Sequence, residues 1–354
     1  MRSGTSRFVL SVAFACLLQL SLVLASAPFS FARASFSAAA ILPPISPAEI
    51  SRRVAELTPI PWDEMAIVKS RHKSGACVTS SVTLHVGDPL DGSRRTITVQ
   101  ELRPAVSGPT GVMLIIPTIE GVGILENHIA ARFCSEGIAS IITDLRDNSQ
   151  PPQMPAWGFE DFTDRNEILG IRTVISYVSQ SPNYDPKKVG MFGLSLGGIV
   201  TSMVAGLEAN RLSALVIAVG GGNLPFTLAR SENDKISLLR KRRMDFLGLQ
   251  TQDQYESELA RTIRYDPLYF AGQANTQSIL MAISTADTRV PYFVQREQFD
   301  AFGKPNYILF SSDHIETLIQ LTFLYLTPVV NFVKSRFTPC GPAIPVPLVV
   351  PMAK

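Results

Sequence analysis

Short apolar runs alternate with segments of helical spacing along most of this chain of 354 residues, and this alternation limits the possible folds more than any other feature. The apolar runs predict buried strands over residues 111–117, 138–144, 187–194, 213–219, 278–285 and 306–311. Helical spacing predicts helices over residues 125–136, 161–180, 196–207 and 318–337. Because alternating strands and helices form parallel sheets, we expect a mostly parallel central sheet with helices on both faces.

The part of the chain before this pattern has strand and turn signals of another kind. Residues 77–86 and 94–102 alternate polar and β-branched side chains around a turn rich in Asp, Pro and Gly, which predicts an antiparallel hairpin. Ahead of the hairpin, residues 47–57 predict a short helix with Ser46 as its N-cap and Pro47 in its first turn.

Two further segments define the expected domain boundaries. Residues 222–273, between two predicted strands, are charged and helical in pattern, and they are too long for an ordinary connection. We expect them to form a small helical cap over the carboxyl edge of the sheet. The Pro-rich residues 338–354 are expected to lie extended on the surface. The main domain then spans residues 71–337, after an N-terminal extension over residues 35–70.

The first 34 residues have the pattern of a secretory signal peptide. Arg2 and Arg7 precede an uncharged apolar run over residues 8–25, and an Ala-Arg-Ala pattern at residues 32–34 offers a cleavage site. We expect the mature protein to be exported, either periplasmic or secreted, without a stable membrane span. The alternative is an uncleaved leader that anchors the protein in a membrane, because a run of this length can just span a bilayer.

Charge and cysteine content bound the remaining function classes. The formal net charge is +2 and the sequence has no dense basic stripe, so binding to nucleic acid is not expected. Without the leader, Cys77, Cys134 and Cys340 remain, which permits one disulfide at most and leaves the pair open. Three buried thiols are the alternative. The spacing of Cys and His residues indicates no metal site.

The strongest chemical signal is the pentapeptide Gly193-Leu194-Ser195-Leu196-Gly197, which lies between a predicted strand and a predicted helix. A serine in this context is typical of a nucleophile elbow, a tight turn that needs small neighbours and lifts the hydroxyl above the sheet. The turn also directs backbone N–H groups and a helix N-terminus at the place where negative charge develops in acyl transfer. We therefore predict that Ser195 is a nucleophile.

A serine nucleophile needs a base and an acid, and both have candidates in the order typical of this elbow. His314 is the only histidine after Ser195, and it is expected in a loop between the last strand and the last helix. Asp287 follows the preceding strand and is expected to orient the imidazole, although it is also a candidate helix N-cap. Asp266 and Asp313 are weaker candidates for the acid.

At these positions the chain resembles the α/β-hydrolase superfamily, and within it the branch of the dienelactone hydrolases, acetyl esterases and prolyl oligopeptidases. The matching motifs are GLSLGG at the nucleophile, STADTRVP at the acid and SDHIE at the base, and the resemblance spans about residues 78–337. It implies an α/β-hydrolase fold with a catalytic triad of Ser195, Asp287 and His314.

The resemblance also implies an oxyanion hole made of backbone N–H groups. One donor is Leu196, and the other is Thr118 or Ile119, in the loop after residues 111–117. Two positions depart from the dienelactone hydrolases, which have Glu where this chain has Thr118 and Cys where it has Ser195. Glu120 could bond within the pocket or cap the following helix.

The implied activity is hydrolysis of a small-molecule carboxylic ester through an acyl-enzyme, with no metal and no organic cofactor. Two alternatives stay open on the sequence. One is a peptidase or amidase of the prolyl oligopeptidase type, and the other is an inactive pseudo-hydrolase that binds a ligand or partner under its cap.

Overall fold

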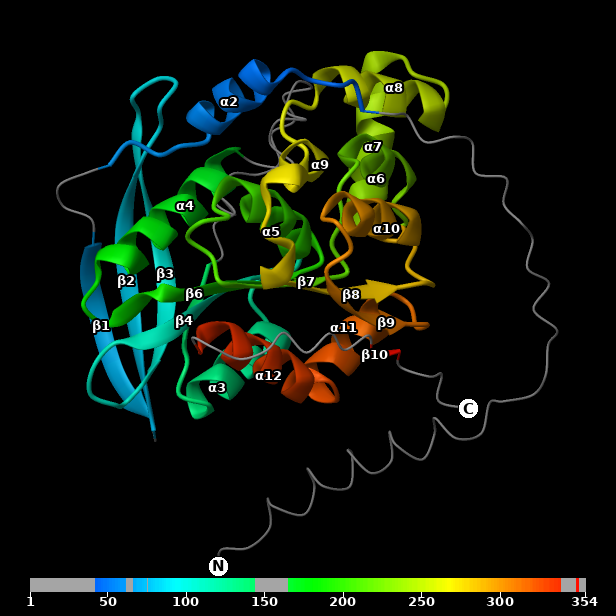
Figure 1. Ribbon diagram of the computed structural model, residues 1–354. Helices are drawn as coiled ribbons and strands as arrows, with labels where there is room; N and C mark the ends of the chain where they lie inside the picture. Colours follow the sequence, from blue (N-terminus) through cyan, green and yellow to red (C-terminus); the bar gives the residue numbers. More distant parts are fainter. Residues whose placement is uncertain (1–41, 62–65, 75, 144–164, 339–347, 350–354) are drawn as a thin grey trace, which may run out of the picture. The chain divides into compact units, whose positions relative to one another are not determined.

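The computed structural model of the protein describes residues 42–61, 66–74, 76–143, 165–338 and 348–349 (Figure 1). The predicted leader lies outside the described residues. The strands are β1 Ala66–Ser74, β2 Cys77–Gly87, β3 Arg94–Pro104, β4 Thr110–Ile116, β5 Ala139–Ile142, β6 Tyr184–Leu194, β7 Ala214–Ala218, β8 Ile279–Ser284, β9 Asn306–Phe310 and β10 Leu348–Val349. The longer helices are α2 Pro47–Glu56, α3 Ile124–Ser135, α4 Arg165–Gln180, α5 Leu196–Leu207, α6 Leu224–Arg230, α7 Asp234–Leu247, α8 Gln252–Thr262, α10 Tyr292–Ala301, α11 His314–Phe323 and α12 Leu326–Phe337, with a single turn at α9 Pro267–Phe270.

All the described strands belong to one sheet in the order β1-β2-β3-β5-β4-β6-β7-β8-β9-β10. From β5 to β10 every neighbouring pair is parallel, whereas β1 and β3 are each antiparallel to β2, and β3 is antiparallel to β5. This confirms the mostly parallel sheet and the predicted hairpin. β1 crosses the expected boundary at residue 70, so strand pairing begins earlier than the sequence pattern indicates.

Helices cover both faces of the sheet because its strands are apolar on both sides. In β4, Val112, Leu114 and Ile116 belong to one buried cluster, while Met113 and Ile115 belong to the other. α4, α5 and α10 cover the first face, and α3, α11 and α12 cover the second (Figure 1). Burying one such side chain contributes about 1.5–3 kcal/mol, so this two-sided core stabilises the sheet.

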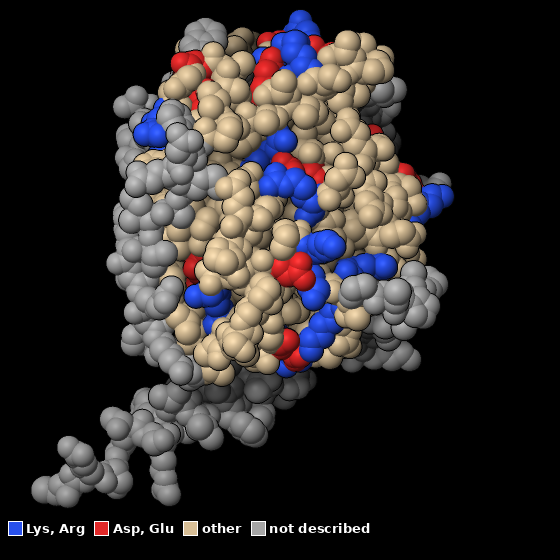
Figure 2. All heavy atoms as spheres, turned by 60° about the vertical axis from the view of Figure 1, so that its left-hand side comes forward, with Lys and Arg blue, Asp and Glu red and all other residues tan. Residues whose placement is uncertain are grey.

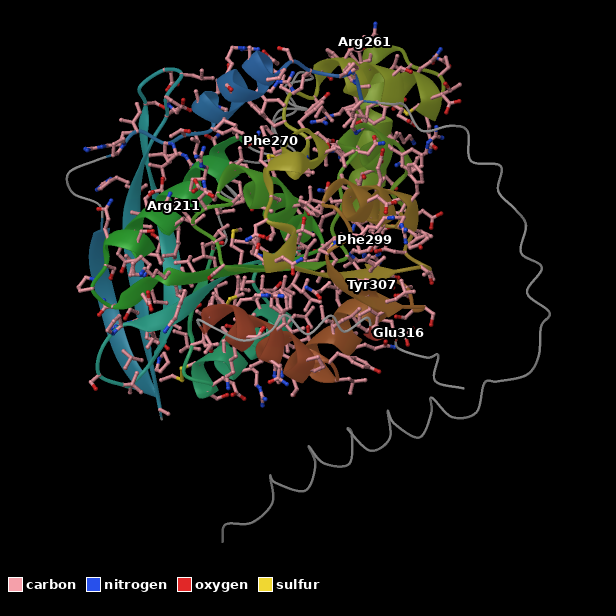
Figure 3. The ribbon with its side chains drawn as sticks, in the orientation of Figure 1. Arg211, Arg261, Phe270, Phe299, Tyr307 and Glu316 are labelled. Carbon is pink, nitrogen blue, oxygen red and sulfur yellow. A yellow bond between two sulfur atoms is a disulfide. The ribbon has the colours of Figure 1, made fainter. Side chains whose placement is uncertain are left out.

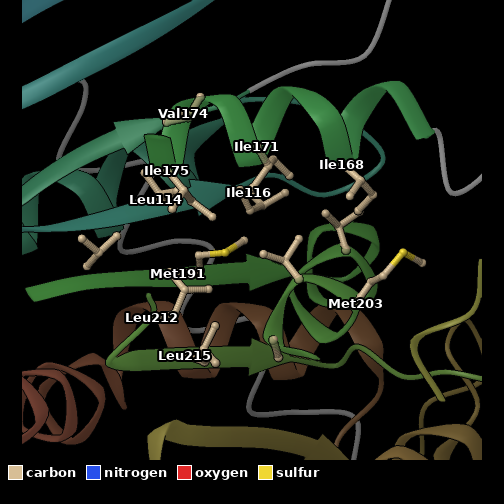
Figure 4. Packing of buried hydrophobic residues seen from close by; sticks show 14 of the residues in the cluster. Leu114, Ile116, Ile168, Ile171, Val174, Ile175, Met191, Met203, Leu212 and Leu215 are labelled. Atoms are coloured by element: carbon tan, nitrogen blue, oxygen red, sulfur yellow. The ribbon is translucent and has the colours of Figure 1, made fainter. Parts of the chain in front are cut away.

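The packing between α4 and the centre of the sheet is tight. Figure 4 shows Ile171 and Ile175 of α4 directed toward Leu114 and Ile116 of β4. All four side chains have no exposed surface. The four-residue spacing of the two isoleucines places them on one helix face, which is the pattern that predicted this helix.

On the same face, toward the other edge of the sheet, an aromatic pair packs α10 against β9. The rings of Phe299 and Tyr307 lie 5.2 Å apart between centroids and 78° between planes, and Figure 3 labels both. This edge-to-face arrangement is the one that aromatic quadrupoles favour.

The face of the molecule in Figure 2 carries basic and acidic side chains interspersed among a majority of other residues. Elsewhere in the described structure, basic and acidic side chains form ion pairs, such as Arg52–Glu49 and Arg165–Asp88. Pairs of this kind contribute little to stability where they are exposed to water.

The N-terminal helix forms where it was predicted and docks on the domain. The Ser46 hydroxyl accepts a hydrogen bond from Glu49 N–H at 3.2 Å, as an N-cap does. Just after the helix, the buried Arg172 guanidinium donates to the carbonyl of Leu57 at 2.6 Å and pairs with Glu208 at 2.5 Å. The extension is therefore fastened to α4 and α5 of the main domain.

The last helical region differs from the prediction of one helix over residues 318–337. Two helices form, α11 and α12, and their axes differ by 66°. Pro328 explains the break, because its ring would clash with the carbonyl of Leu324 in a continuous helix. α11 also begins earlier than expected, because the side chain of Asp313 accepts a hydrogen bond from Glu316 N–H at 2.9 Å and caps the helix.

Over the described ranges, no single helix is both long enough and apolar enough to cross a membrane, and only the bent pair of α11 and α12 taken together meets that length and composition.

Cys77 of β2 and Cys134 of α3 form a disulfide, with their Cα atoms 6.4 Å apart. The bond joins the antiparallel end of the sheet to a helix on its second face. This decides the pairing that the sequence left open, and the alternative of three free thiols was wrong.

We expect replacement of both cysteines, in Cys77→Ser with Cys134→Ser, to lower the free energy of unfolding by about 4 kcal/mol. The bridge closes a loop of 57 residues, and the chain-entropy model assigns about 3–5 kcal/mol to loops of this size. Urea unfolding of the oxidised wild type and the double variant measures the difference. Equal midpoints and slopes would contradict a stabilising bridge.

Candidate active site

Ser195 lies in a sharp turn between β6 and α5. Its backbone has φ 57° and ψ −114°, a region that non-glycine residues rarely adopt. Hydrogen bonds hold the turn, since Ser195 N–H donates to Ala218 C=O at 2.9 Å and Gly197 N–H donates to Pro117 C=O at 3.1 Å. The strained conformation lifts the hydroxyl over the carboxyl edge of the sheet at the N-terminus of α5.

The glycines of the motif are required by space. A Cβ on Gly193 would collide with the carbonyl of Gly197, and one on Gly197 would collide with the carbonyl of Ile116. A Cβ on Gly198 would lie 2.8 Å from the carbonyl oxygen of Ala218. The strand, the turn and the neighbouring strands can approach this closely only without side chains at these positions.

The structure brings the three predicted side chains into one hydrogen-bonded line. His314 Nε2 lies 2.8 Å from Ser195 Oγ, and His314 Nδ1 lies 2.6 Å from Asp287 Oδ2. They follow β6, β8 and β9, whose carboxyl ends lie at the same edge of the parallel sheet. His314 is the first residue of α11, so the prediction that it stands in a loop before the helix was wrong.

Asp287 is held by four hydrogen bonds. Its Oδ1 accepts from the backbone N–H groups of Arg289 and Val290 at 2.8 and 3.0 Å. Its Oδ2 accepts from His314 and from the side-chain amide of Gln295, at 2.9 Å from Nε2. One oxygen of the carboxylate thus contacts the histidine and the other binds the backbone that follows. Asp287 does not cap α10, whose N-cap is Pro291.

These partners also fix the tautomer of the imidazole. All the neighbours of the Asp287 carboxylate are donors, so His314 Nδ1 carries a proton and Nε2 is left to accept one from Ser195. This is the arrangement that a general base needs.

Gln295 is a site residue that the sequence analysis missed. Its side chain is fully buried on α10, where it also accepts from Ser284 N–H at 3.0 Å and donates to Val290 C=O at 2.7 Å. Gln295 therefore joins the end of β8 to the acid. A polar residue on the apolar face of a helix, eight positions after the aspartate, was the available signal.

The two weaker acid candidates are used elsewhere. Asp313 caps α11, as described above. Asp266 is fully buried, and its carboxylate accepts from the N–H groups of Asn223 at 3.1 Å, Leu224 at 2.6 Å and Leu268 at 2.9 Å. One side chain thus fastens both ends of the cap. Burial raises the pKa of Asp266 to about 6, against hydrogen bonds from the backbone that lower it.

The loop after β4 contains the candidates for the second oxyanion donor. Thr118 N–H donates to the buried carboxylate of Glu126 at 3.3 Å, while Ile119 lines the cavities at Ser195. Leu196 is the first residue of α5, so its N–H has no partner within the helix. Glu120 pairs with Lys235 of α7 at 2.6 Å. The N-cap of α3 is Gly123, whose N–H donates to Glu126, so of the two alternatives for Glu120 the helix cap was wrong.

Two cavities meet at Ser195. One, of about 40 Å³, lies under the cap, with walls from Ile199 of α5, Leu224 and Leu228 of α6, and Ile236 of α7. The other, of about 250 Å³, opens between the loop after β4 and α11, and it is the one of the two that His314 lines. The predicted cap is helical and therefore shapes one side of the site.

No group of three or more His, Cys, Asp and Glu side chains that could hold a metal ion is found in the part of the chain that the structure describes.

We expect Gln295→Met to lower kcat/KM for p-nitrophenyl acetate by about 10- to 100-fold. Losing a hydrogen bond to a charged group costs about 1.5–3 kcal/mol, and the histidine is then less firmly oriented. Gln298→Met is a matched control, because Gln298 is equally buried on the same helix and its amide has no hydrogen-bond partner among the described residues. Equal losses in the two variants would contradict a specific role for Gln295.

We expect the stability difference between wild type and Asp266→Asn to depend on pH. Between about pH 4 and pH 6 the folded protein holds a proton that the unfolded chain releases, since the pKa of Asp266 is raised from 3.8 to about 6. Below about pH 4 this proton adds about 3 kcal/mol to the free energy of unfolding of the wild type. The contribution is lost as the pH rises through 6. Urea unfolding at pH 4 to 7 measures it, and a pH-independent difference would contradict it.

Comparison with known proteins agrees with this fold. Residues 99–241 match the dienelactone hydrolase family, and no curated protein matches the chain. Acetyl xylan esterase 1 from Thermoanaerobacterium sp. JW/SL YS485 is similar in structure, with a TM-score of 0.63 at 15% identity, covering 82% of this chain and 93% of the esterase. The acetyl xylan esterase from Paenibacillus sp. R4 has a TM-score of 0.61 at 15% identity, covering 81% and 91%. Est1E from Butyrivibrio proteoclasticus has a TM-score of 0.50 at 16% identity, covering 72% and 98%. The chain therefore has the α/β-hydrolase fold, and its residues 99–241 are similar to the dienelactone hydrolase family.

Proposed function

We propose that the protein is a serine hydrolase that cleaves carboxylic esters with short acyl groups. The observation that carries this proposal is the unbroken line of hydrogen bonds from Ser195 Oγ through the His314 ring to the Asp287 carboxylate. Nucleophile, base and orienting acid are all needed to activate a serine hydroxyl, and each is buried in a fixed position.

In the first step, Ser195 Oγ attacks the ester carbonyl carbon while His314 Nε2 takes the hydroxyl proton. The N–H groups of Leu196 and Ile119 are the proposed donors to the oxyanion, and one such donor is worth about 3–4 kcal/mol. His314 then gives its proton to the leaving alcohol. Water hydrolyses the acyl-enzyme by the same route in reverse.

From the position of His314 we assign one cavity to the alcohol part of an ester and the other to its acyl part. The leaving alcohol must lie on the side of His314, which protonates it, so it occupies the cavity of about 250 Å³. The acyl group then occupies the cavity of about 40 Å³ under the cap. A water molecule needs about 10–15 Å³ on the same scale, so this space accepts only a few heavy atoms.

The comparisons support ester hydrolysis in general. The matched family is that of the dienelactone hydrolases, and two of the structural neighbours are acetyl xylan esterases. An acetyl group has a size that fits the cavity of about 40 Å³ under the cap. The peptidase and pseudo-hydrolase alternatives gain no specific observation from the described residues.

We also propose that the mature protein is exported. The leader pattern over residues 1–34 supports this, and so does the Cys77–Cys134 disulfide, because such bonds persist in oxidising compartments.

We expect the protein to hydrolyse p-nitrophenyl acetate with a kcat/KM at least about tenfold above that for p-nitrophenyl octanoate, because the cavity of about 40 Å³ under the cap has too little volume for the longer chain. Ser195→Ala should lose on the order of 10⁴- to 10⁶-fold in kcat and all labelling by a fluorophosphonate probe. Steady-state kinetics and gel fluorescence measure both. Turnover or labelling that survives in Ser195→Ala refutes the nucleophile, and an unlabelled wild type favours a pseudo-hydrolase.

A further inference from the structure

We propose that the open cavity beside His314 is a subsite for an apolar alcohol, aliphatic or aromatic, and not for a sugar. This inference rests on the proposed function and specifies its leaving group. It is carried by the walls of the cavity, by the state of its polar side chains and by the surface onto which it opens.

Aliphatic side chains from two segments of the chain line this cavity. Val122 precedes α3 and Ile124 is its first residue, while Ile315 and Ile319 lie on α11. These four residues are 39%, 79%, 43% and 47% exposed, although Val and Ile are usually buried. Exposed apolar side chains that gather at the mouth of a catalytic site indicate a surface that a ligand covers.

Apart from Arg289, the charged and amide side chains that line the same cavity are already engaged. The carboxylate of Glu126 accepts from the N–H groups of Thr118 and Gly123, and Glu120 pairs with Lys235. The side chain of Asn233 caps α7 by accepting from two backbone N–H groups at 3.0 and 3.3 Å. A sugar in this position would bury hydroxyl groups for which few partners remain, and burial without a hydrogen bond is costly.

Among the described residues, the lining of the cavity also includes no Phe, Tyr or Trp side chain on which a sugar could stack. Leu318, which is almost fully buried, forms the bottom of the cavity. An alkyl chain or an arene matches such walls without requiring polar partners, and each methylene removed from water favours binding.

Beyond the cavity the apolar surface continues along α11. Ile315, Ile319 and Phe323 recur at every fourth residue and therefore lie on one side of the helix. Phe323 is 46% exposed, and its ring packs against that of His128 of α3 at 4.8 Å. This row of apolar side chains begins next to His314, so a long alcohol can extend from the reacting ester bond onto the row.

The test keeps the acyl group constant and varies the alcohol. Rates of acetate release are measured for ethyl, butyl and hexyl acetate, 1-naphthyl acetate and a fully acetylated methyl xyloside, all below their solubility limits. Because Arg289 also lines the cavity, the acetate ester of lactate is included as an anionic alcohol. We expect kcat/KM to rise about two- to fourfold for each added methylene, so that hexyl acetate exceeds ethyl acetate by at least about tenfold.

A variant and a matched control locate the effect. Ile319→Ser should reduce the ratio of kcat/KM for hexyl acetate to that for ethyl acetate by at least about threefold. Leu238→Ser is the control, since Leu238 is 51% exposed on α7 and lines neither cavity at Ser195. It should leave both the ratio and the activity unchanged.

The two levels of the proposal fail in different ways. If no acetate is released from any ester and Ser195 is not labelled, the proposed function is wrong. If acetate is released but kcat/KM is flat or falls with alcohol length, the apolar subsite is wrong. Preference for the acetylated xyloside or the lactate ester, or an unchanged ratio in Ile319→Ser, overturns it as well.

Discussion

The crowding of backbone around Ser195 is the constraint on which the rest of the site depends. The turn brings the end of β6 and the start of α5 so close to the ends of β4 and β7 that no Cβ fits at Gly193 or Gly197. Within this packing Ser195 keeps a backbone conformation that costs energy on its own. The core on both faces of the sheet supplies that energy, since it holds the strands whose ends form the turn.

The two cavities on either side of Ser195, at the same edge of the sheet, differ in size and in lining. On one side the cap closes over Ser195 and leaves little room, and the buried carboxylate of Asp266 fastens both ends of this cap. On the other side α3 and α11 leave an open, aliphatic cavity that reaches His314. The asymmetry follows from which helices border the serine, so the proposed specificity is a property of the insertion and of two helix ends, while the reacting groups belong to the sheet.

Much of this arrangement was predictable because it depends on local patterns. Ser195, Asp287 and His314 each follow a strand that is recognisable from its apolar run, and parallel strands place their carboxyl ends together. Features set by contacts between distant residues were missed or wrong. The pairing of Cys77 with Cys134 depends on where α3 packs, and Gln295 acquires its role only when α10 folds back onto β8. Similarly, the apolar pattern over residues 318–337 is continuous and predicted one helix. The break between α11 and α12 comes from the effect of Pro328 on the backbone, which that pattern does not include.

The disulfide gives the two sides of the site unequal reinforcement. Cys134 lies near the end of α3, and the beginning of that helix supplies one wall of the open cavity, whereas nothing comparable links the cap to the sheet within the described chain. Material folded under reducing conditions would therefore keep the serine and its partners in line while the wall on the alcohol side loses its covalent anchor. Protein folded under reducing conditions and protein folded under oxidising conditions would then differ in substrate selectivity despite identical sequences.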